Sequence, residues 1–239
     1  MKIALIGYGK MGKAIEEIAI QKKHDIVLKV NSKNQEVLDE LSKAEIDVCI
    51  EFSAPHVAFD QVKKCLQAGI PTVSGTTAWA DKMLVAEKIA EEHKTAFLWA
   101  SNFSIGMNIF FEVNKKLASM MSVQSDYNVS MEEIHHTQKK DAPSGTAVSL
   151  AEDIIDRMPN KNKWVNHESQ QPDEIPIISK RIDPAPGTHT IRYSSFIDDI
   201  MIQHTAHNRV GFATGAVVAA EFLFQKKGIY TMKDVLGLS

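Results

Sequence analysis

The sequence predicts an α/β protein in which a parallel-sheet domain is interrupted by a second domain of α+β type. Short apolar segments alternate with amphipathic segments over roughly the first hundred residues, and a glycine-rich turn follows the first apolar segment. After Ser104 the pattern changes to longer helices and alternating strands. Alternating strands and helices give a parallel sheet covered on both faces, which makes this the expected architecture of the first part.

Composition and charge exclude several classes of protein. The chain has 239 residues, of which 44% are hydrophobic and 24% charged, so it can form one large domain or two modest ones. Its formal charge of −3 gives no general attraction to nucleic acid or to an anionic membrane. No apolar stretch approaches the roughly 18–20 residues that span a bilayer, and the apolar run before Gly7 is too short for a signal peptide. Cys49 and Cys65 lie in apolar patterns typical of core residues. We therefore expect a cytoplasmic protein that binds neither nucleic acid nor a membrane.

The first hundred residues supply the elements of the parallel sheet. Apolar segments with the length of buried strands are Lys2–Ile6, Ile26–Val30, Asp47–Phe52, Pro71–Val73 and Ala96–Trp99. Helical spacing puts Met11, Ala14, Ile15, Ile18 and Ala19 on one face, and does the same later for Ala58, Val62, Cys65 and Leu66. Gly69 is expected to end this later helix.

A glycine-rich turn joins the first strand to the first helix. Its residues are Gly7, Tyr8, Gly9, Lys10, Met11 and Gly12, which match the pattern Gly-x-Gly-x-x-Gly. Glycines let the backbone turn tightly and approach a pyrophosphate, which then meets free N–H groups at the helix start. The strand–turn–helix context predicts a Rossmann-like dinucleotide-binding domain, with these residues contacting the cofactor. A glycine-rich turn without a ligand is the alternative.

The end of the second strand bears on the choice of cofactor. This position normally carries an acid for the adenosine ribose, but here the residues are Asn31, Ser32 and Lys33. Asn31 and Ser32 can hydrogen-bond a 2′-hydroxyl or a 2′-phosphate, and Lys33 would favour the phosphate. The sequence therefore favours NADPH and leaves NADH open. Lys33 can equally be a solvated turn residue.

Two more loops follow the carboxyl ends of predicted strands, where open α/β sheets bind ligands. Their small residues, hydroxyls and amides suit the nicotinamide-ribose end of a cofactor. The residues are Gly75, Thr76 and Thr77 in one loop and Ala100, Ser101, Asn102 and Phe103 in the other.

The inserted domain is predicted from the elements after Ser104. Apolar spacing predicts helices over Met107–Met121 and Val148–Met158, with a strand over Tyr127–Met131 between them. Residues 159–176 are polar and contain proline, which predicts an exposed loop. A hairpin is expected over His189–Phe196 and Ile200–Ala206, followed by a helix from Ala213 to Phe224 and a strand near Ile229–Val235 that rejoins the first sheet. We therefore assign 1–104 and 209–239 to the dinucleotide-binding domain and 105–208 to an α+β substrate domain.

The stretch from Glu133 to Ala147 carries the most chemistry. Its sequence is EIHHTQKKDAPSGTA, which places a proton donor suited to neutral pH beside two lysines and a Ser-Gly-Thr turn that opens a helix. A helix start with glycine and hydroxyl residues suits a carboxylate as it suits a phosphate. The stretch therefore predicts a site that binds an anionic substrate and handles a proton.

Plainer interpretations of this stretch remain open. His135 and His136 could ligate a metal with Glu133 or Asp141, but no third ligand stands at a recognisable spacing, so we expect no metal. Asp141 and Ser144 could serve only as helix caps. Lys140 is expected to be exposed to solvent.

With these motifs in place, the sequence resembles the dihydrodipicolinate reductase (4-hydroxy-tetrahydrodipicolinate reductase) family of lysine and diaminopimelate biosynthesis. The pattern Glu-x-His-His-x-x-Lys-x-Asp-Ala-Pro-Ser-Gly-Thr-Ala is very specific to that family. The resemblance covers nearly the whole chain and rests on Gly7–Gly12, Glu51-Phe52-Ser53, Gly75-Thr76-Thr77, Ala100–Ser104, Glu133–Ala147 and Arg209–Ala216.

The resemblance implies an oxidoreductase with defined residue roles. The family reduces a cyclic, imine-derived dicarboxylate to tetrahydrodipicolinate with NADH or NADPH and loss of water. By this resemblance His135 is the proton donor and Lys139 the second catalytic residue, while His136 and the amides of Gly145 and Thr146 hold the substrate carboxylates. Members of the family look like homotetramers joined through the substrate-domain sheets, so residues 105–208 would also serve oligomerisation. The missing acid at Asn31 departs from the family pattern and leaves the choice between NADPH and NADH open.

Two other functions are carried as alternatives. One is a dehydrogenase of the same fold that acts on an amino acid or an aldehyde, such as an aspartate or homoserine dehydrogenase-like enzyme. Such an enzyme would have no evident use for the His-His-x-x-Lys and Ser-Gly-Thr pairing. A non-catalytic NAD(P)-sensing module would need neither an acid nor a cation in the second domain.

Overall fold

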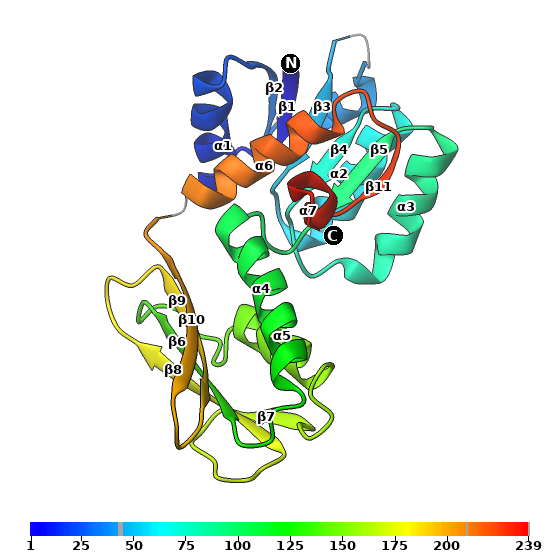
Figure 1. Ribbon diagram of the computed structural model, residues 1–239. Helices are drawn as coiled ribbons and strands as arrows, with labels where there is room; N and C mark the ends of the chain where they lie inside the picture. The colour runs from blue at the N-terminus through cyan, green and yellow to red at the C-terminus, as the bar shows by residue number, and fades with distance from the viewer. Residues whose placement is uncertain (43–44, 209, 239) are drawn as a thin grey trace. The chain divides into compact units, whose positions relative to one another are not determined.

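A computed structural model describes residues 1–42, 45–208 and 210–238 of the chain (Figure 1). The chain forms two units, the first made of Met1–Ile105 and Val210–Ser239 and the second of Gly106–Arg209. Each unit has its own sheet and its own hydrophobic core, which confirms the predicted α/β class with a second, α+β part. Within the described ranges, no helix has the length and apolar character needed to cross a membrane.

The sheet of the first unit is wholly parallel. Its strand order is β11-β5-β4-β3-β1-β2, and every neighbouring pair runs in the same direction. The predicted strands before Ser104 are confirmed to within one residue at each end. The strands are β1 (Lys2–Ile6), β2 (Asp25–Val30), β3 (Val48–Glu51), β4 (Thr72–Ser74), β5 (Ala96–Trp99) and β11 (Gly228–Tyr230).

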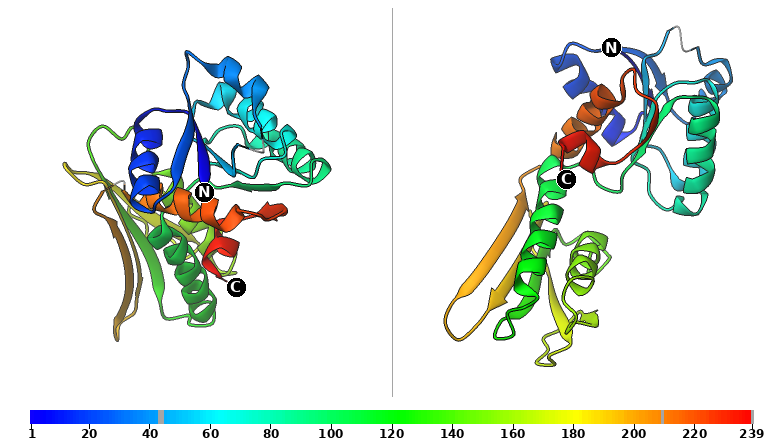
Figure 2. Two further views of the ribbon diagram at one scale, coloured as in Figure 1. Left: turned by 90° about the horizontal axis from the view of Figure 1, so that it is seen from above. Right: turned by 45° about the vertical axis from the view of Figure 1, so that its right-hand side comes forward.

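Helices cover both faces of this sheet, as Figure 2 shows. Side chains of β1 alternate, so Ile3 and Leu5 pack in one core with α1 and α6, while Ala4 and Ile6 pack on the other side with Cys65 of α2. Burial on both faces explains why the strands are continuous apolar runs. The helices of this unit are α1 (Lys10–Gln21), α2 (Pro55–Gln67), α3 (Met83–Glu92), α6 (Val210–Leu223) and α7 (Met232–Leu236), with short 3-10 turns η1 (Gln35–Glu40) and η2 (Ala80–Lys82).

The end of the chain differs from the prediction. The strand expected near Ile229–Val235 does rejoin the first sheet, as β11 beside β5, but it ends at Tyr230 and α7 begins at Met232. The cause is a capping box, in which Thr231 and Asp234 satisfy each other's backbone N–H groups at the helix start. Arg209, the first residue of the last family-like segment, lies outside the described residues, and Val210–Ala216 opens α6.

The second unit is a mixed sheet with helices on one face. The order is β10-β9-β6-β8-β7, with β8 parallel to both β6 and β7 and with β9 antiparallel to both β6 and β10. Helices α4 and α5 share a core with β6, β8 and β9. The elements are α4 (Ile105–Met121), β6 (Asn128–His135), α5 (Gly145–Ile155), β7 (Lys163–Val165), β8 (Glu174–Arg181), β9 (Gly187–Ser194) and β10 (Asp199–Ala206).

The prediction of an exposed loop over 159–176 is only partly confirmed, because most of the segment is irregular but two parts of it form strands. This segment contains β7 and the start of β8, and the buried Lys161 anchors it by donating from Nζ to the carbonyl oxygens of Pro172 and Glu174. Strand β8 escaped the sequence analysis because Pro176 interrupts it and proline usually argues against a strand. The predicted β9–β10 hairpin is confirmed.

Candidate functional site

The three glycines of the turn between β1 and α1 are needed for different reasons. Gly7 has a φ of +93°, and a Cβ there would lie 2.1 Å from the carbonyl oxygen of Phe52. A Cβ at Gly12 would lie 2.6 Å from the carbonyl oxygen of Gly7. At Gly9, by contrast, a Cβ would meet no described atom within 4 Å. Packing therefore requires Gly7 and Gly12, whereas Gly9 leaves open space that suits the approach of a ligand.

The start of α1 offers hydrogen-bond donors. The amides of Gly7 and Tyr8 donate to the carbonyl of Val30, and that of Gly9 donates to the carbonyl of Gly7. Among the described residues, no side chain caps α1. Amides in the first helical turn have no acceptor within the helix, so those of Lys10, Met11 and Gly12 are the donors that a pyrophosphate would meet. The turn therefore fits a dinucleotide.

A cavity of 350 Å³ lies beside this turn. The predicted cofactor residues Gly7, Tyr8, Gly9, Asn31 and Ser32 line it. The sequence analysis missed other wall residues, chiefly Phe52, Ser53, His56 and Gln61, although their position after the carboxyl end of β3 could have indicated them.

The polar atoms of the cavity wall bear on what it can bind. Gln61 is 5% exposed, and its Oε1 has no hydrogen-bond partner among the described residues, so a ligand N–H would satisfy it. Asn31 Oδ1 accepts from the amide of Lys33 at 2.8 Å, which fixes the turn after β2. The lining contains no carboxylate, so nothing in the described wall repels a 2′-phosphate.

Glu51 is a fully buried carboxylate that organises the loops after β3 and β4. It accepts hydrogen bonds from the hydroxyls of Ser53 at 2.6 Å, Ser74 at 2.6 Å and Thr76 at 2.5 Å. The hydroxyl of Thr76 also accepts from the amide of Ser53 at 2.8 Å. Thr76 was predicted as a cofactor contact, but its side chain hydrogen-bonds within the protein and links the loops after β3 and β4. Sequence reasoning gave Glu51 no role in the site.

The other predicted cofactor residues do not line the cavity. Phe103 is buried against Phe52, with ring centroids 5.4 Å apart, and Asn102 Oδ1 accepts from the amide of Ser104 at 2.9 Å. A Cβ at Gly75 would lie 2.2 Å from the ring of Phe52. The full set outside the lining is Lys10, Met11, Gly12, Gly75, Thr76, Thr77, Ala100, Ser101, Asn102 and Phe103.

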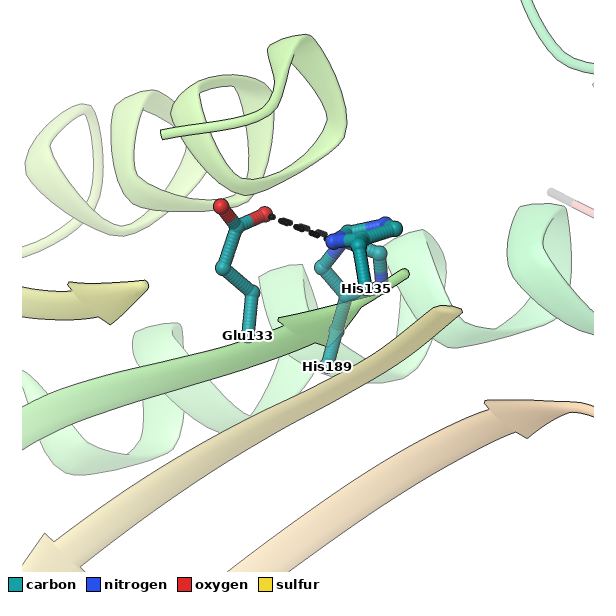
Figure 3. Close-up of side chains that lie close together, drawn as sticks. All are labelled: Glu133, His135 and His189. Atoms are coloured by element: carbon teal, nitrogen blue, oxygen red, sulfur yellow. Dashed lines mark ion pairs between the residues drawn. The ribbon is translucent and has the colours of Figure 1, made fainter. Parts of the chain in front are cut away.

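In the second unit, the predicted acid lies in a buried cluster at the end of β6. Glu133 and His135 rise from the same side of β6, and His189 stands opposite Glu133 on β9 (Figure 3). Glu133 Oε2 lies 3.4 Å from His135 Nδ1 and 3.8 Å from His189 Nε2. The sequence analysis did not single out His189, although its alternation with the buried Ile191 and Tyr193 would have placed it on the core side of β9.

The other oxygen of Glu133 joins three elements. Oε1 accepts from the amide of Ser144 at 3.0 Å and from Arg181 Nη2 at 3.2 Å. Ser144 is the cap of α5, because its Oγ accepts from the amide of Ala147 at 3.2 Å. Glu133 thereby ties β6 to the start of α5 and to the end of β8. The interpretation of Ser144 as a helix cap is confirmed.

Burial and charge set the protonation of this cluster. Burial lowers the pKa of His135 below its ordinary value, the Glu133 carboxylate opposes this, and the charges of Lys139 and Arg181 add to the lowering. Burial, with the neighbouring His135, lowers the pKa of His189 to about 4. Burial alone would raise the pKa of Glu133, but hydrogen bonds from Ser144 and Ser179 hold it below its usual value. At neutral pH Glu133 is therefore charged and His189 neutral.

The cluster also has the dimensions of a metal-binding triad. Ligand atoms of Glu133, His135 and His189 lie within 4.8 Å of one another, which the sequence spacing did not reveal. However, Arg181 already donates to this carboxylate, and the positive charge of Lys139 also acts on His135. A divalent cation would be repelled by both. We therefore keep the prediction of no metal at this cluster.

The loop after β6 presents the remaining predicted residues. Lys139 Nζ pairs with Asp141 Oδ2 at 2.8 Å, so Asp141 is an ion-pair partner rather than a cap. Arg181 Nε donates to the carbonyl oxygen of Lys139 at 3.2 Å and thereby holds the loop backbone. Gly145 and Thr146 form the first turn of α5, and a Cβ at Gly145 would meet nothing within 4 Å among the described atoms.

The side chains of His136 and Lys140 make no hydrogen bond or ion pair with another described residue. His136 is half-buried, and beside it the hydroxyl and amide of Thr137 donate to Asp183 and lower the pKa of that carboxyl. Lys140 is exposed, as expected. The loop thus combines a buried histidine, a lysine and an approachable helix start, a set that can protonate one atom of a ligand and bind its carboxylates.

Comparison with known proteins agrees with this geometry. Residues 1–103 match the family described as "Dihydrodipicolinate reductase, N-terminus", and residues 106–236 match "Dihydrodipicolinate reductase, C-terminus". A relative from Christiangramia forsetii, named 4-hydroxy-tetrahydrodipicolinate reductase, is 51% identical over 99% of this chain and 98% of its own length. A relative of the same name from Alkaliphilus oremlandii is 34% identical over 96% of this chain and 95% of its own.

The solved structures show the fold. A dipicolinate-bound dihydrodipicolinate reductase from Paenisporosarcina sp. TG-14 superposes with a TM-score of 0.74 at 24% identity, covering 97% of each chain. The family models cover nearly the whole chain, and the resemblance found from the motifs is confirmed. The chain belongs to the dihydrodipicolinate reductase family.

Proposed function

We propose that this chain is an oxidoreductase that reduces 4-hydroxy-tetrahydrodipicolinate to tetrahydrodipicolinate with NADH or NADPH, in lysine and diaminopimelate biosynthesis. The observation that carries the proposal is the Glu133–Ala147 segment, which sets a buried histidine on a carboxylate beside a lysine and an approachable helix start. Relatives named for this activity match nearly the whole chain, which supports the same assignment. No specific observation favours an amino-acid or aldehyde dehydrogenase or a sensing module.

The first unit, Met1–Ile105 with Val210–Ser239, is the cofactor-binding part of this proposal. The first-turn amides of Lys10, Met11 and Gly12 would hold the pyrophosphate, and Asn31 and Ser32 the adenosine ribose. When bound, the reduced nicotinamide supplies the hydride. The loops around Thr77 and Ser101, whose side chains are exposed, are proposed to face the nicotinamide end.

His135 is the proposed proton donor. Its Nδ1 faces Glu133, so Nε2 is the atom that would deliver the proton. In the free enzyme burial lowers the pKa of His135, but a dianionic substrate beside it would raise that pKa and favour the protonated form. Substrate binding would therefore favour protonation of His135, which supplies the proton that the reaction needs.

Lys139, His136 and the start of α5 are proposed to bind the substrate carboxylates. Lys139 would exchange its ion pair with Asp141 for one with the substrate, which keeps its charge compensated in both states. The Ser144 cap occupies only the amide of Ala147, so the amides of Gly145 and Thr146 remain as donors for a carboxylate.

Changing Asn31 to aspartate should shift the enzyme toward NADH. The added charge would stand at the cavity wall beside a 2′-phosphate, so we expect the NADPH-to-NADH ratio of kcat/KM to fall by about tenfold, or about 1.4 kcal/mol. Asn31→Ala is the matched control, because it removes the same side chain without adding charge. An unchanged ratio in Asn31→Asp would show that this residue does not face the 2′ position.

We also propose a homotetramer joined through the second-unit sheet. No described helix covers the face of this sheet opposite α4 and α5, where Ile178, Thr190 and Arg192 lie around a hollow. Met201 is 53% exposed on β10, and Phe196 is fully exposed at the hairpin tip. Light scattering should return four times the chain mass at assay concentration, and the mass of one chain would contradict the proposal.

The free, buried Cys49 and Cys65 support placing the enzyme in the cytoplasm.

A coupled assay tests the proposed activity. The upstream synthase would generate the substrate, and absorbance would follow the oxidation of NADPH or NADH on adding this chain. Oxidation that depends on both the chain and the synthase product is expected. No oxidation with either cofactor would overturn the proposal.

A further inference from the structure

We propose that Glu133 is the positioning residue of the acid. Its carboxylate determines which nitrogen of His135 carries the deliverable proton, and it stabilises the protonated form of His135. The inference rests on the proposed function only in calling His135 the acid, because the contacts themselves are those of the free chain. Glu133 would act through His135 and would not touch the substrate.

The carboxylate of Glu133 is held so that one oxygen faces His135. Oε1 is fixed by the amide of Ser144 and by Arg181 Nη2, at 3.0 and 3.2 Å. Oε2 and His135 Nδ1 are both buried, both without a hydrogen-bond partner among the described residues, and 3.4 Å apart. Leaving two such atoms unpaired is costly, and a shift of a few tenths of an ångström would pair them. A proton between them places N–H on Nδ1, so neutral His135 has its lone pair on Nε2.

His189 does not compete for this carboxylate. Its Nε2 lies 3.8 Å from Glu133 Oε2 but 3.3 Å from Ser144 Oγ. Because Ser144 Oγ accepts from the amide of Ala147, its own hydrogen can be donated to His189 Nε2. The ring of His189 stands edge-on to that of His135, with centroids 5.1 Å apart, and covers one side of the pair. In this arrangement Ser144 uses the lone pair of His189 Nε2, and the neutral ring brings neither a proton nor a charge to Glu133.

Among the charges around His135, that of Glu133 has the main influence in favour of protonated His135. Arg181 from β8 and Lys139 from the loop disfavour a second positive charge, as does burial, while His189 from β9 is neutral. Asp141 is the other carboxylate that acts on His135, and it is already paired with Lys139. Removing the charge of Glu133 should therefore lower the pKa of His135 further. An acid loses activity as pH rises through its pKa, so the alkaline fall in rate should move to lower pH.

The experiment compares Glu133→Gln with Glu152→Gln. Glu152 is exposed on α5 and lies outside the cluster, so this control removes the same charge without touching His135. Nitrogen-15 NMR of the histidines would give the pKa and tautomer of His135, and kcat/KM would be measured across pH. In Glu133→Gln we expect the pKa to fall by at least about one unit, and kcat/KM near pH 7 by at least about tenfold. Glu133→Asp should recover part of both losses, and Glu152→Gln should change neither.

Two results would overturn the inference. One is an unchanged His135 pKa and rate profile in a folded Glu133→Gln protein. The other is a neutral His135 in the wild-type chain that carries its proton on Nε2. This result needs no variant, so the test stands even if Glu133→Gln does not fold. Because NMR reads His135 without turnover, a failure here is distinguishable from a failure of the proposed activity.

Discussion

Replacing His135 by glutamine should lower kcat by about 10²–10⁴, the usual contribution of a positioned general acid. Glutamine fills similar space and can hydrogen-bond Glu133, but it has no proton to give at neutral pH. The described residues that line the cavity beside Gly9 all belong to the first unit, so cofactor affinity should be unchanged. Steady-state kinetics and fluorescence titration with NADPH would measure the two quantities.

The matched control for this change is His167→Gln. His167 is exposed in the same unit, and its Nδ1 lies 2.8 Å from the carbonyl oxygen of Glu168, so its replacement should leave kcat unchanged. Full activity in His135→Gln would contradict the assignment of the acid. Equal losses in the two variants would point to a general effect of losing a histidine.

Replacing Lys139 by alanine should lower kcat/KM by about 10²–10³, since a fixed charge near a reacting dianion contributes on this scale. The change leaves Asp141 unpaired but exposed, so little of the loss should come from stability. The melting temperature would be measured with the kinetics to separate the two effects.

Lys140→Ala provides the comparison, because Lys140 is the adjacent lysine and is exposed. It should behave as the wild type in both KM and kcat. If the two alanine variants lose activity equally, the loop contributes only a general positive field. Lys139 would then have no specific role.

The parallel sheet could be predicted from sequence because burial on both faces leaves a strong signal. Strands β1 to β5 are short apolar runs and are found to within one residue at each end. Strand β8 is hidden by Pro176, and α7 begins with a capping box that outweighs the apolar residues near it. Single-sequence patterns fail where one residue or one cap decides the local structure.

The candidate site could be predicted only in part. His135 and Lys139 stand in a specific local motif, whereas His189 joins the cluster through the register of β9 against β6, which a single sequence does not determine. Arg181 reaches Glu133 from β8, a strand that the sequence did not reveal. Glu51 and Gln61 work through burial, a property of the folded chain. The local motif therefore predicted the central residues of the candidate site, and the strand pairing brought the groups that contact them.

The most direct test of the central claim is isotope transfer. NADPH or NADH deuterated at the transferable position would be incubated with the chain and the synthase product, and the cyclic dicarboxylate analysed by mass spectrometry. The account predicts one deuterium in tetrahydrodipicolinate with the wild type, and a strongly reduced yield of labelled product with His135→Gln. Binding of the cofactor without any label in the dicarboxylate would contradict it.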